Sequence, residues 1–164
     1  WSIGNGLVGF VAGMALLFKN RQRSMDTVLW IGGVLAVVTV LLFLLNPKTP
    51  NGMYFDPETG NFGQTPLTIF AGVTILIGFL LVLIVRFAFG NNVDVAAAVT
   101  WGMLGNIIGI LFASLSDIFI NGFSLVAAVV GEFLPAAGPN LIFAAILVPL
   151  LVAAYAAVQR QSGR

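Results

Sequence analysis

The chain contains no cysteine and no histidine among its 164 residues. Zinc sites of the Cys/His type, iron–sulfur clusters, His-ligated haem and thiol redox chemistry are therefore excluded within these residues. Catalytic Ser–His and Cys–His pairs are excluded for the same reason. There is also no P-loop, no G-x-S-x-G motif and no G-x-G-x-x-G sequence that follows a predicted strand. We expect no cofactor, no metal site and no enzymatic activity.

Charge is scarce as well. Charged residues make up 8% of the chain and hydrophobic residues 59%, and the mean hydropathy is +1.05. A soluble domain has about 25% charged residues, so this chain cannot cover itself with a water-compatible surface. Seven cations spread over the whole length form no basic patch, so we expect membrane lipids and no nucleic acid as partners. The composition predicts an all-α, polytopic helical membrane protein.

The gaps between charged residues place the membrane spans. A helix needs about 20 apolar residues to cross about 30 Å of hydrocarbon. This rule predicts a single transmembrane domain, residues 1–164, with about five spans, at residues 3–18, 27–45, 66–87, 95–115 and 139–158. Thr65 and Pro66 are typical of a helix N-cap and first helical position. The polar residues 46–64 form the predicted external loop between the second and third spans.

The uncharged stretch 118–131 is too short to span, because a helix of that length reaches only about 21 Å. We therefore predict a short interfacial or re-entrant half-helix at residues 123–132. Pro135, Gly138 and Pro139 are expected to break the backbone before the last span. Irregular backbone at membrane depth must be satisfied by protein or by a water-filled cavity, so this break is a first indication of function.

The orientation follows from the distribution of Lys and Arg across the short loops. If the first span runs inward, one side of the membrane holds Lys48 and the other holds six cations: Lys19, Arg21, Arg23, Arg86, Arg160 and Arg164. This asymmetry predicts a multi-pass protein of the cell membrane whose C-terminus is cytoplasmic. The loop 46–64 is then outside.

Small residues recur at a spacing of four in two of the predicted spans. Gly9 and Gly13 form one such pair, and Gly105 with Gly109 and Ala98 with Gly102 form two others. This spacing lets helix backbones approach closely in lipid. It indicates either tight packing within the chain or a face on which another element docks.

Few polar groups interrupt the apolar stretches, and each is expected to face protein or a cavity, because an unpaired polar group in hydrocarbon costs several kcal/mol. One interpretation is that these groups and Trp1, which could stack on a flat ligand, converge on an outward-facing pocket for a small molecule; the residues are Trp1, Asn5, Asn106, Asp117, Glu132 and Asn140. The alternative is a helix–helix hydrogen bond for Asn106, solvated carboxylates at the interface, and Trp1 in the aromatic belt.

Two stretches carry a resemblance to a known family. The opening WSIGNGLVGFVAGM precedes a basic loop, and residues 102–158 combine a helix with an internal Asn, a D-I-x-I exit and a final N-x-I-x-x-x-I-L-x-P-L-L helix. Together they resemble the substrate-binding (S) components of energy-coupling factor (ECF) vitamin transporters. The resemblance implies a subunit that binds a vitamin or similar micronutrient outside. A transmembrane coupling protein and two cytoplasmic ATPases would be its partners.

Two departures from this family pattern remain. The hairpin around the 46–64 loop is an insertion, and the family's N-terminal helices have no counterpart ahead of Trp1, so we expect an N-terminal portion to be missing. The alternative function is a non-catalytic structural subunit of a larger membrane complex, respiratory or photosynthetic. An intramembrane enzyme is disfavoured, because no pair of catalytic groups occurs at a usable spacing.

Overall fold

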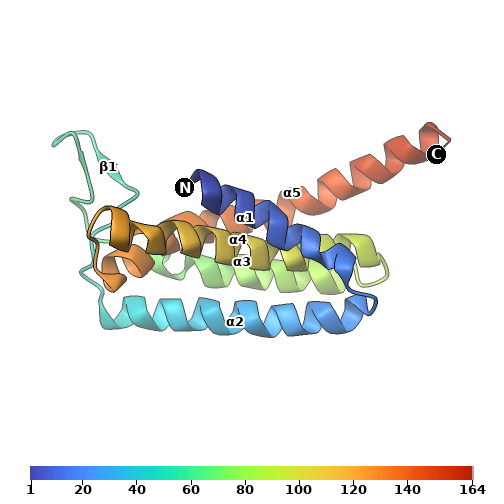
Figure 1. Ribbon diagram of the computed structural model, residues 1–164, viewed down its shortest axis with the longest axis horizontal. Helices are drawn as coiled ribbons and strands as arrows, with labels where there is room; N and C mark the ends of the chain where they lie inside the picture. The colour runs from blue at the N-terminus through green and yellow to red at the C-terminus, as the bar shows by residue number, and fades with distance from the viewer. Residues whose placement is uncertain (164) are drawn as a thin grey trace.

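The computed structural model describes residues 1–163, and most of them are helical (Figure 1). The helices are α1 Ser2–Gly13 with the 3₁₀ turn η1 Met14–Leu17, α2 Arg21–Leu45, α3 Ile69–Ala88, α4 Val93–Ile120, and the π-helix η2 Ala127–Phe133 with α5 Leu134–Gln161. The predicted all-α helical membrane class is confirmed. Arg164, one of the six cations counted above, lies outside the described residues.

Four helices are long and apolar enough to cross a membrane: α2, α3, α4, and η2 together with α5. The first predicted span, residues 3–18, is a shorter apolar helix. It has 12 α-helical residues followed by four in the 3₁₀ turn, so its length is about 26 Å against the 30 Å of a hydrocarbon core.

The four long helices run in alternating directions, so the connections gather at two ends of the bundle (Figure 1). We call the end with residues 18–20 and 89–92 the basic end, and the end with residues 46–68 and 121–126 the hairpin end. At the hairpin end, β1 Phe55–Asp56 pairs antiparallel with β2 Asn61–Phe62. The C-terminal half of α5 extends away from the other helices beyond the basic end.

Ion pairs tie the helices together at the basic end. Arg86, in the last turn of α3, is only 3% exposed, and its Nη2 donates to Asp26 Oδ1 of α2 at 2.8 Å. Arg21 at the start of α2 pairs with Asp94 in the first turn of α4. A buried guanidinium is tolerated here because a carboxylate accepts from it.

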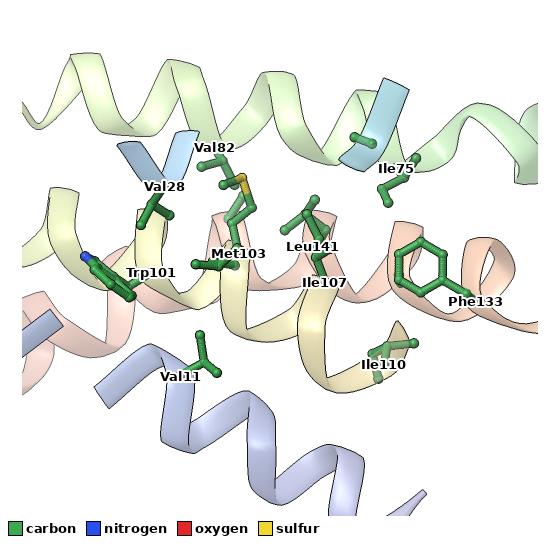
Figure 2. Close-up of a cluster of buried hydrophobic side chains, with 14 of the residues drawn as sticks. Val11, Val28, Ile75, Val82, Trp101, Met103, Ile107, Ile110, Phe133 and Leu141 are labelled. Atoms are coloured by element: carbon green, nitrogen blue, oxygen red, sulfur yellow. The ribbon is translucent and has the colours of Figure 1, made fainter. Parts of the chain in front are cut away.

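The centre of the bundle is α4, which contacts α1, α2, α3 and α5. Figure 2 shows Met103 and Ile107 of α4 between Val28 of α2, Val82 of α3 and Leu141 of α5. Because lipid tails are as apolar as these side chains, close packing rather than the hydrophobic effect holds such helices together. A shape-matched interior is therefore the main source of stability in the membrane-embedded part.

Glycines bring α1 and α4 into backbone contact. A Cβ built on Gly109 would lie 2.5 Å from the carbonyl oxygen of Gly4, and one on Gly4 would lie 2.6 Å from that of Gly109. Gly105 is equally close to the carbonyl of Val8. By contrast, a Cβ on Gly9 or Gly13 would meet nothing within 4 Å. Gly105 and Gly109 thus pack within the chain, whereas Gly9 and Gly13 leave an open face.

The predicted half-helix at residues 123–132 and the break at Pro135–Pro139 are wrong. Residues Ala127–Gln161 form one continuous helix, with Pro135 in the first turn of α5. Pro135 has no N–H to donate within the helix. One turn earlier, the backbone N–H of Gly52 donates to the carbonyl of Gly131 in the π-helical segment, at 2.7 Å. The loop therefore gives this carbonyl a donor from outside the helix.

Two other boundaries differ from the predicted ones. Helix α3 begins at Ile69 rather than residue 66, because Pro66 lies in a β-bridge with Pro50, and Thr68 is the N-cap that accepts from the N–H of Ala71 at 3.2 Å. Helix α4 continues to Ile120. In the loop, Asp56 accepts from the Glu58 N–H and the Thr59 hydroxyl, which hold the pKa of Asp56 below its usual range.

We expect Gly109→Ala to lower the free energy of unfolding by about 1–3 kcal/mol, the usual cost of overpacking, because its Cβ would overlap the Gly4 carbonyl. Gly9→Ala adds the same methyl group to α1 where nothing lies within 4 Å, and it should leave stability unchanged or raise it slightly. Thermal unfolding of the two variants in detergent measures this difference. Equal effects would show that the α1–α4 backbone contact is not a stabilising one.

Candidate functional site

A groove of about 540 Å³ lies where α1, α4 and α5 meet. Along α4 it extends from Ala98 to Ile110, which is about 18 Å of helix at 1.5 Å per residue. We call it the three-helix groove, and it is lined by Asn5, Val8, Gly9, Ala12, Ala98, Gly102, Asn106, Ile110, Asn140, Phe143, Ala144 and Val148.

Small side chains keep the three-helix groove open. Gly9 and Gly102 face it from α1 and α4, and a Cβ on either would meet nothing within 4 Å. Alanines at 12, 98 and 144 form much of the remaining wall. Three of the small residues singled out by their spacing thus line a cavity instead of packing against another helix of the chain.

Three amides, one from each helix, converge on the three-helix groove. Asn106 is 5% exposed, and its Nδ2 donates to the carbonyl of Ala137 in α5 at 3.0 Å, whereas no group of residues 1–163 donates to its Oδ1. The side chains of Asn5 and Asn140 are exposed and make no hydrogen bond within the same residues. The groove therefore offers both donors and acceptors to an occupant.

Two carboxyl groups lie together at the hairpin end. Asp117 in α4 and Glu132 in η2 are 7% and 8% exposed, and α4 packs against η2. Asp117 Oδ2 accepts from the indole Nε1 of Trp1 at 3.3 Å, and its Oδ1 accepts from Asn121 Nδ2 at 2.6 Å. We call Asp117 and Glu132 the carboxyl pair.

The sequence-based interpretation placed six residues in a single pocket. The structure brings Asn5, Asn106 and Asn140 together in the three-helix groove, and the other three, Trp1, Asp117 and Glu132, at the hairpin end. Asn106 and Asp117 lie 11 positions apart on α4, about three helical turns, and so share one face. The three-helix groove and the carboxyl pair thus lie at successive positions along α4. Binding of a substrate by these six residues stays a prediction.

Sequence reasoning missed some of the residues that shape these two places. Asn121 follows Asp117 by four positions, the spacing at which side chains meet on a helix, so its contact could have been anticipated. The contact of Gly52 with η2 could not, because it joins a loop to a helix 79 positions later. Within residues 1–163 no group of three His, Cys, Asp or Glu side chains could hold a metal ion.

A second hollow, of about 600 Å³, is larger but chemically unlike the three-helix groove. It lies between α2 and α3. Its lining consists of Asp26, Gly33 and eight apolar side chains. An apolar trough of this kind on the outside of a membrane bundle suits a lipid acyl chain. We therefore take the three-helix groove, with its three amides, as the candidate site.

Comparison of the chain with protein-family models, with curated proteins and with solved structures finds no match.

We expect Asn106→Ala to lower the free energy of unfolding by about 0.6 kcal/mol and by no more than about 1.7 kcal/mol, the average and the maximum measured for hydrogen bonds between membrane helices, because its bond to Ala137 is lost. Asn140→Ala removes an equal amide that has no partner in the described residues, so its stability should match or exceed that of the unsubstituted chain. Unfolding in detergent compares the two. A larger loss for Asn140→Ala would contradict the assignment of the α4–α5 bond.

Proposed function

We propose that the chain is the membrane-embedded solute-binding subunit of a multi-subunit transporter. Three amides from three helices meet in one groove, two of them without any partner in the described residues, and this observation carries the proposal. In hydrocarbon such groups cost several kcal/mol unless something polar covers them. A solute with hydrogen-bonding groups and a shape that fills about 540 Å³ would cover them.

The resemblance to ECF S components makes the proposal more specific. The bound solute is then a vitamin or similar micronutrient taken up from outside. The chain works with a transmembrane coupling protein and two cytoplasmic ATPases, and it performs no chemistry of its own. Its contribution is differential affinity for the solute in two conformations, since a ligand shifts an equilibrium only by that difference. The hydrolysis of ATP by the partners drives the change between them.

The cell membrane is the proposed location, with the basic end in the cytoplasm. Lys19, Arg21, Arg23 and Arg86 lie at the basic end, and α5 carries Arg160 past it, whereas Lys48 lies at the hairpin end. This distribution supports the orientation by the positive-inside rule. The hairpin and the carboxyl pair then lie at the outer end, where a solute would enter.

One observation favours a second function, that of a non-catalytic structural subunit. The C-terminal half of α5 extends from the bundle (Figure 1) and exposes a large apolar surface that includes Leu150, Leu151, Tyr155 and Val158. Such a surface suits contact with other membrane subunits as well as with lipid. A transporter subunit also needs such contacts, so the groove decides between the two functions.

A thermal-shift screen of the purified chain against vitamins tests the proposal. A ligand that binds the folded state raises the melting temperature by mass action. We expect Asn5→Ala and Asn140→Ala each to weaken binding about 2- to 10-fold, the equivalent of one hydrogen bond of about 0.5–1.5 kcal/mol.

The matched control is Asn91→Ala, an exposed asparagine in the turn before α4 at the basic end, which should bind as the unsubstituted chain does. If no solute raises the melting temperature while the chain purifies in a fixed ratio with other membrane subunits, the structural role replaces the transport role.

Single-cysteine labelling tests the orientation, because the chain has no cysteine of its own. With the hairpin outside, Glu58→Cys should react with a membrane-impermeant maleimide on intact cells. Ser162→Cys, just after α5, should react only once the cells are permeabilised. The reverse pattern would place the C-terminus outside and the basic end with it.

A further inference from the structure

The unsatisfied polar atoms of the interior are concentrated near the carboxyl pair. Three buried side-chain N or O atoms of residues 1–163 lack a hydrogen-bond partner: Arg86 Nε at the basic end, and Ser114 Oγ and Glu132 Oε2 at the hairpin end. Ser114 is fully buried and lies one turn before Asp117 on α4. An unmade hydrogen bond of this kind costs about 1–3 kcal/mol, and more for a charged group.

No cation of the described chain balances the two carboxyl groups. Both ion pairs found in residues 1–163 lie at the basic end, between Arg21 and Asp94 and between Arg86 and Asp26. The groups that donate to the Asp117 side chain are an indole N–H and an amide, and Glu132 is the other carboxyl group of the pair. Two buried carboxyl groups without a countercharge repel each other when both are ionised, and otherwise they must share a proton.

The backbone holds Glu132 where it is. Glu132 lies in a π-helical segment. The π-helix is rare in proteins, and where it does occur it is often at a functional site. The loop covers Glu132 closely: a Cβ on Gly52 would lie 3.1 Å from Cγ of Glu132, and one on Gly131 would lie 2.7 Å from the carbonyl oxygen of Pro50. Both glycines let the 46–68 loop lie directly over Glu132.

We propose that the carboxyl pair receives the positively charged group of the transported solute, an ammonium or similar organic cation. This inference rests on the proposed transport function and names its substrate class. A cation between Asp117 and Glu132 gives Oε2 its missing partner and removes the repulsion between the two side chains.

The remainder of the solute has a place on the same side of α4. Asp117 lies seven positions after Ile110, the last α4 residue of the three-helix groove, which is two helical turns or about 10 Å. A molecule of vitamin size is long enough to span that distance. The carboxyl pair therefore selects for charge, and the amides of the groove bind the neutral part.

The test uses the purified full chain with matched probes, choline chloride against its neutral isostere 3,3-dimethyl-1-butanol, and methylammonium chloride against methanol, at constant ionic strength with sodium chloride. Affinity is measured by calorimetry and by thermal shift. We expect each cation to bind at least ten times more tightly than its neutral isostere. Glu132→Gln and Asp117→Asn should each remove at least ten-fold of that affinity.

The matched control is Glu58→Gln, because Glu58 is an exposed carboxylate in the 46–68 loop at the hairpin end. This variant should bind both cations as the unsubstituted chain does. Equal binding of cations and isosteres overturns the inference, and so does unchanged cation binding in both carboxyl variants. If Glu132→Gln only raises the melting temperature and no cation is preferred, the pair is a structural one that shares a proton, and the inference is also overturned.

The same measurements separate this inference from the proposed function. A neutral or anionic vitamin that binds through Asn5 and Asn140, with no preference for cations, leaves the transport function standing and removes the inference. Cations that bind through Glu132 in a chain that takes up no solute when reconstituted with its co-purified subunits support the cation site and remove the transport function. Absence of any binding counts against both.

Discussion

Every polar group inside a bilayer must find a partner, and this constraint explains most of what distinguishes the chain from a simple bundle of apolar helices. The backbone meets it within the helices, except where proline removes a donor. Near Pro135 a donor comes from outside the helix, because the N–H of Gly52 donates to the carbonyl of Gly131. That bond holds the 46–68 loop against η2, at the start of a continuous 35-residue helix.

The same constraint gives the functional hypothesis its physical content. Side chains that find partners within the chain, such as Asn106 with Ala137 and Arg86 with Asp26, serve the fold. Those that do not, Asn5 and Asn140 in the three-helix groove and Glu132 at the hairpin end, are left for something that the chain does not provide. These side chains are distributed along one side of α4. A single elongated solute that binds all of them is therefore a simpler hypothesis than several separate ligands.

Close packing of α4 against its neighbours makes these positions rigid. Backbone contact at Gly4, Gly105 and Gly109 fixes α1 on one side of α4, and Met103 and Ile107 fill the space toward α2, α3 and α5 (Figure 2). A groove between three helices fixed in this way keeps its shape without an occupant. The C-terminal half of α5 has no such neighbours, which makes it the part of the chain best placed to contact another subunit.

The sequence by itself determined the helical membrane class, the approximate positions of the long helices and the small set of polar residues that need explanation, because hydropathy and helix length are local properties. It could not determine which small residues pack and which stay open: the pairs Gly9 and Gly13, and Gly105 and Gly109, have the same spacing and opposite environments. Nor could it show that Pro135 leaves the helix unbroken, or that six candidate residues divide into a groove and a carboxyl pair. These outcomes depend on which backbones meet across dozens of positions, and only the tertiary structure decides that.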